Sequence, residues 1–236
     1  MTRIRTGTAG WALPRTVRER FPPAASNLER YAACFDVAEI NSSFYRPHRP
    51  ATYARWAASV PDAFRFSVKL PRAITHEARL EHCEAPLARF AAEVAGLGPK
   101  LGALLVQLPP RLTFDPGVAA TFFELLSRAA PGPIVCEARH PSWFDAQADA
   151  LLTRHRVARA ATDPAIVAAA ELPGGWPGLS YFRLHGSPRT YWSSYDEAAL
   201  TRWAAAADAA GGEIWVIFDN TASGAATANA LDFGKR

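Results

Sequence analysis

The stretch VAEINSSFYRPH, residues 37 to 48, begins as a buried strand and continues into a dense cluster of polar and aromatic groups. Side chains alternate between the two faces of a strand, so Glu39, Asn41 and Ser43 share one face. Ala38 and Ile40 lie on the opposite, apolar face. One face is therefore suited to packing against helices, and the other ends in groups that are suited to holding a ligand.

Strand-like runs alternate with helix-like segments over the rest of the chain. The other strand-like runs are rich in β-branched or aromatic residues and cover residues 4–8, 64–70, 101–108, 133–139, 157–162, 179–186 and 213–219. Helix-like segments lie between them, one directly after Ser26-Asn27 and the others at residues 51–60, 85–97, 115–130 and 196–212.

Eight strands that alternate with helices predict an α/β fold, a single (β/α)₈ barrel of the TIM type in which residues 1–236 form one domain. The sixth helix should lie in residues 163–178, which read as a short or degenerate helix followed by a loop. A doubly wound open sheet is the alternative. No G-x-G-x-x-G motif or P-loop follows any strand, which argues against the nucleotide-binding versions of that alternative.

The composition predicts a soluble, cytoplasmic protein with no membrane partner. Apolar residues make up 49% of the chain, and the formal net charge is +4. The chain shows neither the apolar segment of a signal peptide nor a stretch long enough to span a membrane. Cys34, Cys83 and Cys136 are too widely spaced to indicate a zinc site or a disulfide framework. A nucleic acid is a possible partner but is not favoured, because the basic residues form no continuous stripe.

The alternation of side chains predicts one cluster of polar groups inside the barrel. Glu39 and Asn41 face inward, because Ala38 and Ile40 suit the side that faces the helices. The same argument adds Ser67, Lys69, Glu137, Arg139, Tyr181, Arg183 and His185, and Gln107, Asp219 and Asn220 stand at the ends of the fourth and eighth strands. Active sites of this fold lie at the carboxyl ends of the strands, where these residues gather.

Glu39, Glu137 and His185 are the candidate catalytic residues. Two carboxylates in unlike environments can differ in pKa, as acid–base chemistry at neutral pH requires. The imidazole of His185 titrates near neutrality and can also carry a proton. A structural network in which the glutamates neutralise arginines would account for the same charges. The amide, histidine and aromatic groups beside those charges favour the active site.

The predicted substrate-binding residues are of three kinds. Guanidinium and ammonium groups would hold an anion, amides would orient it, and aromatic rings in the loops would stack on a sugar ring or a base. In that order these residues are Arg139, Arg183 and Lys69, then Asn41, Gln107 and Asn220, then Tyr45 and Trp143. A Schiff base at Lys69 is the less favoured alternative, because nearby carboxylates should keep the amine protonated.

The sequence predicts no metal site and no cofactor. Glu39, Glu137, His185 and Asp219 are of the residue types that metal-dependent barrels use as ligands. However, a lysine and two arginines are expected among them, and these fixed cations would repel a divalent ion.

Several blocks of the chain resemble, in order, those of the YecE-like family. These blocks are GTAGW, AEINSSFYRPH, FRFSVKLPRAITH, ALLVQLPPRL, CEARHPSW, YFRLHGSPRTYWSSY and WVIFDNTASGAATANA, and they extend from residue 5 to about residue 233. The family is a domain of unknown function with a TIM-barrel fold. The resemblance therefore implies the barrel, and it places the polar residues above in the family's motifs. It implies no reaction.

Together these observations favour a cofactor-independent enzyme of the hydrolase or isomerase type that acts on a small anionic or sugar-like substrate. Two other classes of function remain open. The barrel would instead be a non-catalytic module that binds an anionic metabolite or a nucleic acid, or it would be a metal-dependent hydrolase or nuclease.

Overall fold

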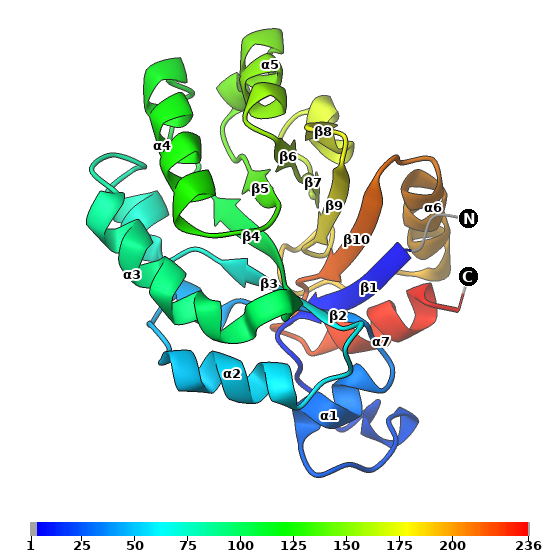
Figure 1. The fold of residues 1–236 in the computed structure, drawn as a ribbon. Helices are drawn as coiled ribbons and strands as arrows, with labels where there is room; N and C mark the ends of the chain where they lie inside the picture. Colours follow the sequence, from blue (N-terminus) through cyan, green and yellow to red (C-terminus); the bar gives the residue numbers. More distant parts are fainter. Residues whose placement is uncertain (1–3, 236) are drawn as a thin grey trace.

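The structure is a computed structural model that describes residues 4–235. All of its strands belong to one curved sheet with the order β7-β9-β10-β1-β2-β3-β4-β5-β6-β8, and the helices lie outside that sheet (Figure 1). The strands are β1 Ile4–Ala9, β2 Val37–Ile40, β3 Arg65–Lys69, β4 Leu101–Gln107, β5 Ile134–Glu137, β6 Val157–Arg159, β7 Ala161–Asp163, β8 Gly174–Gly175, β9 Leu179–Leu184 and β10 Glu213–Phe218.

The barrel closes through a strand that is split in two. The expected strand at 157–162 is interrupted at Ala160. Its first half, β6, pairs in parallel with β5, and its second half, β7, pairs in parallel with β9. The ring of eight strand positions is thereby completed, and the predicted TIM-type barrel is confirmed. The short β8 is an addition that pairs antiparallel with β6.

Seven α-helices cover the outside of the described barrel (Figure 1). They are α1 Asn27–Ala32, α2 Pro50–Ala58, α3 Glu84–Val94, α4 Pro116–Ala129, α5 Ala146–Arg154, α6 Glu197–Asp208 and α7 Ala225–Phe233. Side-chain oxygens cap the first turns of α4, α5 and α6, where Asp115, Asp145 and Asp196 accept hydrogen bonds from backbone N–H groups. The aspartate before Ala146 is the local signal for α5, a helix that the sequence pattern had not indicated.

The sixth helix is degenerate, as predicted. Between β7 and β9 the chain forms a 3₁₀ turn at Ala168–Glu171 and the two-residue β8, and no α-helix. Residues 172–178 contain two prolines and three glycines, and these residues disfavour a helix interior. The expected strand at 37–44 is also shorter than predicted. It ends at Ile40, and the chain turns into a 3₁₀ helix at Ser42–Phe44.

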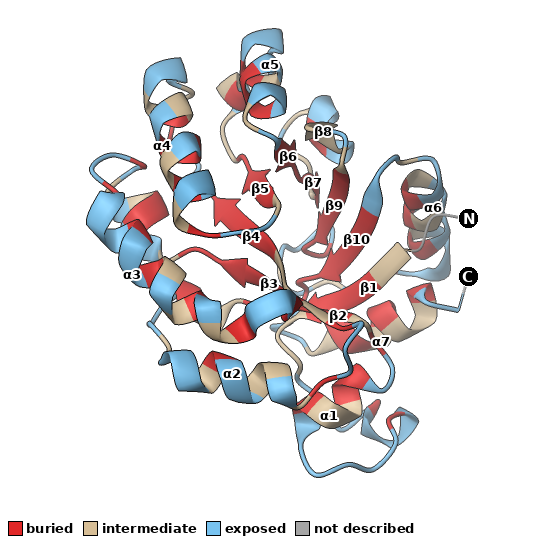
Figure 2. Cartoon of the chain, in the orientation of Figure 1, coloured by how far each residue is buried: buried red, intermediate tan, exposed pale blue. Residues whose placement is uncertain are grey.

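Two separate apolar cores confirm which side chains of the strands point toward the helices and which point into the barrel. The larger core lies between the strands and the helices and includes Ala38, Ile40, Phe182 and Leu184. The smaller core fills the barrel interior and includes Val37, Ala103, Leu105, Val135, Tyr181, Trp215 and Ile217. Figure 2 shows that the strands are mostly buried along their length, whereas the helices present an exposed side. The interior is thus packed with side chains below its polar end, as is usual for this fold.

A close backbone approach ties the first two strands together beside the cluster. A Cβ atom on Gly7 would lie 2.1 Å from the carbonyl oxygen of Val37, so no other residue fits there without a backbone shift. The hydroxyl of Tyr31 donates to the same carbonyl oxygen and accepts from the backbone N–H of Thr8. These contacts set β2, and therefore Glu39, against β1.

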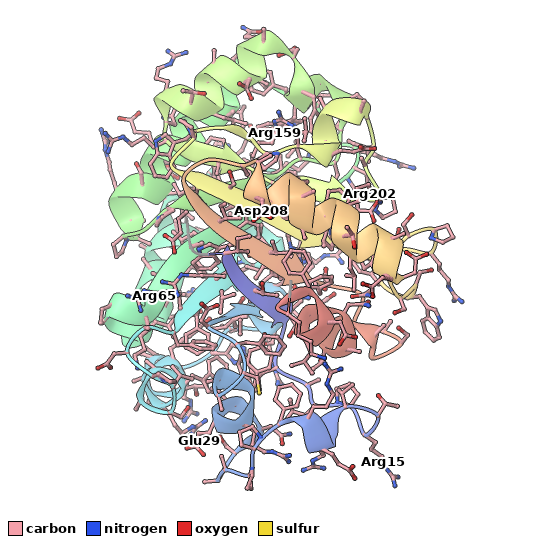
Figure 3. The ribbon with its side chains drawn as sticks, turned by 90° about the vertical axis from the view of Figure 1, so that its right-hand side faces the viewer. Arg15, Glu29, Arg65, Arg159, Arg202 and Asp208 are labelled. Atoms are coloured by element: carbon pink, nitrogen blue, oxygen red, sulfur yellow. The ribbon has the colours of Figure 1, made fainter. Side chains whose placement is uncertain are left out.

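Most of the basic residues are arginines, and Figure 3 shows Arg15 and Arg202 on the outside of the molecule. Only three of the 26 basic residues are lysines. In the part of the chain that the structure describes, no helix combines the length and apolar character that crossing a membrane requires.

Candidate functional site

The polar cluster lies at the carboxyl ends of four strands. Glu39 is on β2, Glu137 ends β5, Arg183 is on β9, and Asp219 directly follows β10. Each of these residues is at most 3% exposed. Three carboxylates therefore share a buried site, and ionised carboxylates are stable there only when cations and hydrogen-bond donors surround them.

Arg183 pairs with all three carboxylates of this cluster. Its Nε and Nη2 atoms donate to the two oxygens of Glu39 over 2.9 and 2.7 Å. Nη2 also donates to Asp219 over 2.9 Å, and Nη1 donates to Glu137. Burial disfavours the charged guanidinium, but the three carboxylates outweigh burial and hold the pKa of Arg183 well above its usual value. Since every nitrogen of the guanidinium is already engaged, Arg183 does not fit its predicted role as a receptor for a substrate anion.

Both carboxylate oxygens of Glu137 accept hydrogen bonds from neighbouring side chains. It accepts hydrogen bonds from Arg183, from Arg139 over 2.8 Å, and from the side-chain amide of Gln107 over 3.0 and 3.1 Å. Burial alone would raise the pKa of Glu137, but Arg183, Arg139 and His185 hold it well below its usual range. The carboxyl group is therefore ionised at neutral pH, and it does not fit the predicted role of a general acid.

The imidazole of His185 lies between two carboxylates. Its Nδ1 atom is 3.1 Å from Asp219 Oδ2, and its Nε2 atom is 3.3 Å from Glu137 Oε1. The second contact has ion-pair distance but lacks hydrogen-bond geometry, so buried Nε2 has no hydrogen-bond partner in the described residues. Burial would lower the pKa of His185, but Glu137 and Asp219 together raise it. His185 can therefore carry a proton at neutral pH.

Lys69 and Arg139 are the two cations of the cluster whose positive charge is not fully paired with carboxylates of the described residues. Lys69 ends β3 and is 5% exposed, and no carboxylate of the described residues lies within 4 Å of its Nζ atom. The side chain of Arg139 is 26% exposed and pairs with one carboxylate. Its Nη2 atom donates to the hydroxyl of Tyr191 over 2.7 Å. The carboxylates of the described residues therefore leave part of the positive charge of these two side chains unpaired.

Four of the predicted binding residues lie outside this network. Tyr45 is 74% exposed and lines an outer groove of about 560 Å³ with Phe44 and Arg72. Asn41 lies just beyond β2 and lines a separate cavity of about 330 Å³ that Glu39 also borders. Its buried Oδ1 atom has no partner in the described residues.

The two other residues serve the packing of loops. Trp143 is 1% exposed, its ring packs edge-on against Phe114, and its indole N–H donates to the carbonyl of Leu112. The ring is therefore in the outer core, and stacking on a substrate does not fit this position. Asn220 is fully buried, and its amide donates to the Ser193 carbonyl and to the Asn229 side chain, which fixes the loop after β9.

Two residues contribute more than the sequence indicated. Asp219 was placed at the end of the eighth strand, but the only role considered for it was that of a metal ligand, and in the structure it joins Arg183 to His185. Its place directly after a buried strand was the available signal. Tyr191, in the loop after β9, was not among the predicted site residues, but its hydroxyl accepts a hydrogen bond from Arg139 and its ring packs edge-on against His185. Tyr191 has a φ of 66°, a left-handed conformation that is uncommon for a non-glycine residue.

The arrangement does not resemble a metal centre. In residues 4–235, no group of three or more histidine, cysteine, aspartate or glutamate side chains is placed to hold a metal ion together. The guanidinium of Arg183 occupies the space between Glu39, Glu137 and Asp219 that a cation would need.

The ionised carboxylates make stability depend on pH. Burial opposes the low pKa of Asp219, but Arg183 and His185 lower it below its usual value. A group whose pKa is lower in the folded state contributes stability above its unfolded pKa of about 4 and loses it as the pH falls. His185, whose pKa is raised, contributes in the opposite sense and loses its part as the pH rises above about 6.5.

We therefore expect the free energy of unfolding to decrease on both sides of about pH 4 to 6.5. In Asp219→Asn, the slope of this free energy against pH on the acid side should be shallower by up to about 1.4 kcal/mol per pH unit. Urea unfolding between pH 3 and 7 measures the slope. The control Asp208→Asn, on the exposed side of α6 (Figure 3), should keep the parent slope. Equal slopes in all three proteins would contradict the assignment.

Comparisons with known proteins agree with the barrel. Residues 5–236 match the model of a family described as "Protein of unknown function DUF72". The UPF0759 protein YecE of Escherichia coli K12 is 33% identical over 143 residues, which are 60% of this chain and 50% of that protein. The UPF0759 protein YunF of Bacillus subtilis is 28% identical over 152 residues, 60% of this chain and 52% of that protein. The matched region thus spans about half the length of these curated relatives.

Two crystal structures have the same fold. A DUF72 family protein from Enterococcus faecalis V583 superposes with a TM-score of 0.79 at 22% identity, and covers 100% of this chain and 97% of its own. A DUF72 family protein from Thermotoga maritima MSB8 gives a TM-score of 0.78, also at 22% identity, with 98% of each chain covered. At this level of identity the likeness concerns the fold alone.

Proposed function

This chain belongs to the DUF72 family, and we propose that its barrel is a cofactor-independent enzyme of the hydrolase or isomerase type. The substrate would be a small anionic or sugar-like molecule that binds at the carboxyl ends of the strands. One observation carries the proposal. A buried histidine whose Nε2 atom contacts Glu137 but has no hydrogen-bond partner among the described residues lies in a network of carboxylates, and two cations of the cluster are only partly engaged by this network.

The roles of the residues follow from their surroundings. His185 transfers the proton, because Glu137 and Asp219 raise its pKa and so favour the imidazolium, which can donate a proton. Asp219 and Glu137 position the imidazole and stabilise its charged form. Arg139 receives the anionic group of the substrate with the part of its guanidinium that Glu137 and Tyr191 leave unused. Lys69, which interacts electrostatically with Glu39, Glu137 and Asp219, adds a second positive charge to the site.

Arg183 and Glu39 would act as the frame of this site. Both oxygens of Glu39 are occupied by Arg183, and the Tyr181 hydroxyl donates to one of them over 3.1 Å. Of the predicted catalytic pair of glutamates, neither has an oxygen free for substrate. The network is in this respect structural, and it supports catalysis by holding His185 and Arg139 in place.

A panel of phosphorylated aldoses and ketoses, sugar acids and sugar lactones tests the proposal. Proton NMR in D₂O would detect exchange of a carbon-bound proton and also the appearance of isomerised or hydrolysed products. We expect at least one panel member to exchange or react faster than in the absence of protein. Calorimetry should show that Arg139→Met weakens binding of that compound by about 1.5–3 kcal/mol, because a charged hydrogen bond is lost.

Two results would count against this function. A compound that binds in the calorimeter, but exchanges no proton and yields no product, would indicate a non-catalytic binding module. Binding that is equally strong in Arg139→Met would show that the anion lies elsewhere, for instance in the outer groove beside Tyr45 and Arg72.

A further inference from the structure

The lysine at the end of β3 differs from the other two lysines of the chain. No carboxylate of the described residues lies within 4 Å of Lys69 Nζ, which is 4.2 Å from the centre of the Phe44 ring. The Ser43 hydroxyl donates to the backbone carbonyl of Lys69 over 2.6 Å, which fixes the start of the side chain. The amine is thus held at an apolar surface beside the ionic cluster, and it makes no hydrogen bond or ion pair within the described residues.

The other lysines have ordinary structural roles. Lys100 is buried, and its Nζ atom donates to the carbonyl oxygens of Ala57 and Val60. Lys235 is exposed and lies 3.4 Å from Asp232. Neither of them faces the candidate site. The three amines therefore form a natural series of one buried and bonded group, one exposed group, and one group that is buried without a bond.

We propose that the amine of Lys69 forms an imine with the carbonyl carbon of an anionic aldehyde or ketone whose negative group is held by Arg139. This inference rests on the proposed function and narrows its substrate class to carbonyl compounds. The nucleophile for such a reaction must be an uncharged amine within a site that also supplies a proton donor.

The surroundings of Lys69 shift its amine toward the uncharged form, which is the first of these requirements. Burial and the nearby Arg183 lower the pKa of Lys69 to about 8, against the opposing effect of Glu39, Glu137 and Asp219. The carboxylates thus keep most of this amine protonated at pH 7, but burial and Arg183 leave a larger uncharged fraction than an ordinary lysine has. At pH 7 about one tenth of such amines are uncharged, compared with fewer than about one in a thousand for an ordinary lysine.

The chemical steps balance without an oxidant or a reductant. The lone pair of Nζ forms a bond to the carbonyl carbon, and one amine proton moves to the carbonyl oxygen to give a carbinolamine. The imidazolium of His185 then protonates the hydroxyl group, which leaves as water while the nitrogen lone pair forms the C=N bond. The product is a protonated imine, and neutral His185 recovers its proton from solvent. Buried Glu137 and Asp219 stabilise the cationic product.

Reductive trapping with a small anionic aldehyde tests the inference. Glyoxylate and cyanoborohydride would be added to the complete protein at pH 7, and the label would be mapped to peptides by mass spectrometry. We expect Lys69 to be labelled at least about tenfold faster than Lys235, because more of its amine is uncharged. Arg139→Met should slow labelling of Lys69 and leave Lys235 unchanged. Acetaldehyde, which carries no anion, should lose the preference for Lys69 in part.

The outcomes separate the two proposals. Label on Lys235 alone would overturn the imine at Lys69. Lys69→Arg keeps the positive charge but forms no imine. If this variant still exchanges deuterium into the panel compound at the parent rate, the imine is wrong and the acid–base function stands. If the parent protein traps glyoxylate at Lys69 but changes no panel compound, the amine is reactive and the proposed function fails.

Discussion

Arg183→Met is expected to lower the free energy of unfolding by about 3–5 kcal/mol, because it removes the shared partner of three buried carboxylates. Glu39, Glu137 and Asp219 would then repel one another in a site that excludes water. Methionine has a similar length and keeps most of the packing volume. Urea unfolding, followed by far-UV circular dichroism at pH 7, measures the loss. Arg183→Lys should recover part of it, because it restores the charge but not the forked hydrogen bonds.

Arg139→Met is the matched comparison for this prediction. Its side chain is 26% exposed and pairs with Glu137 alone, so the loss of stability should be about 1 kcal/mol. Similar stability for Arg183→Met and Arg139→Met would mean that the buried network is not what holds the interior together. If Arg183→Met is too unstable to purify, Arg183→Lys still distinguishes the two outcomes, because it should fall between the parent protein and total loss.

His185→Gln is expected to slow the proposed reaction by about 10²–10⁴-fold, since the amide that replaces the imidazole neither gains nor loses a proton near neutral pH. The rate would be measured as deuterium exchange into whichever panel compound the parent protein converts. Binding of that compound should change little, because Arg139 rather than His185 holds the anionic group. A large loss of rate with nearly unchanged affinity is the signature of a group that acts on the reacting atoms.

A remote histidine provides the control. His155 follows α5, away from the ionic cluster, and lines a surface cavity with Arg156 and Trp176. His155→Gln makes the same chemical change and should keep the parent rate. Exchange in His185→Gln within about threefold of the parent rate would contradict the role of the imidazole, since a proton-transfer group contributes far more than that.

Part of this site could be predicted from local patterns in the sequence. The alternation of Ala38, Glu39 and Ile40 was enough to place the carboxylate inside the barrel. Successive side chains of a strand point to opposite sides of the sheet, and this depends only on the strand itself. The same holds for Tyr181 and Arg183 in β9. Alternation stops where the strand ends, at Ile40, so it could not fix the direction of Asn41, which lines the same cavity as Glu39. Trp143 was misplaced for a related reason. A loop has no period from which the direction of a ring can be inferred.

The sequence by itself determined the barrel, the inward face of each strand and the end at which the charges gather, because each of these follows from residues close together in the chain. Only the tertiary structure decided how the charges pair. Arg183 meets Glu39 across 144 positions of sequence and Glu137 across 46, and such pairings depend on which strands are neighbours around the ring. That pairing engages every nitrogen of Arg183. Among the described residues it leaves no carboxylate within 4 Å of Lys69, because the carboxylates nearest to that amine are already paired with Arg183.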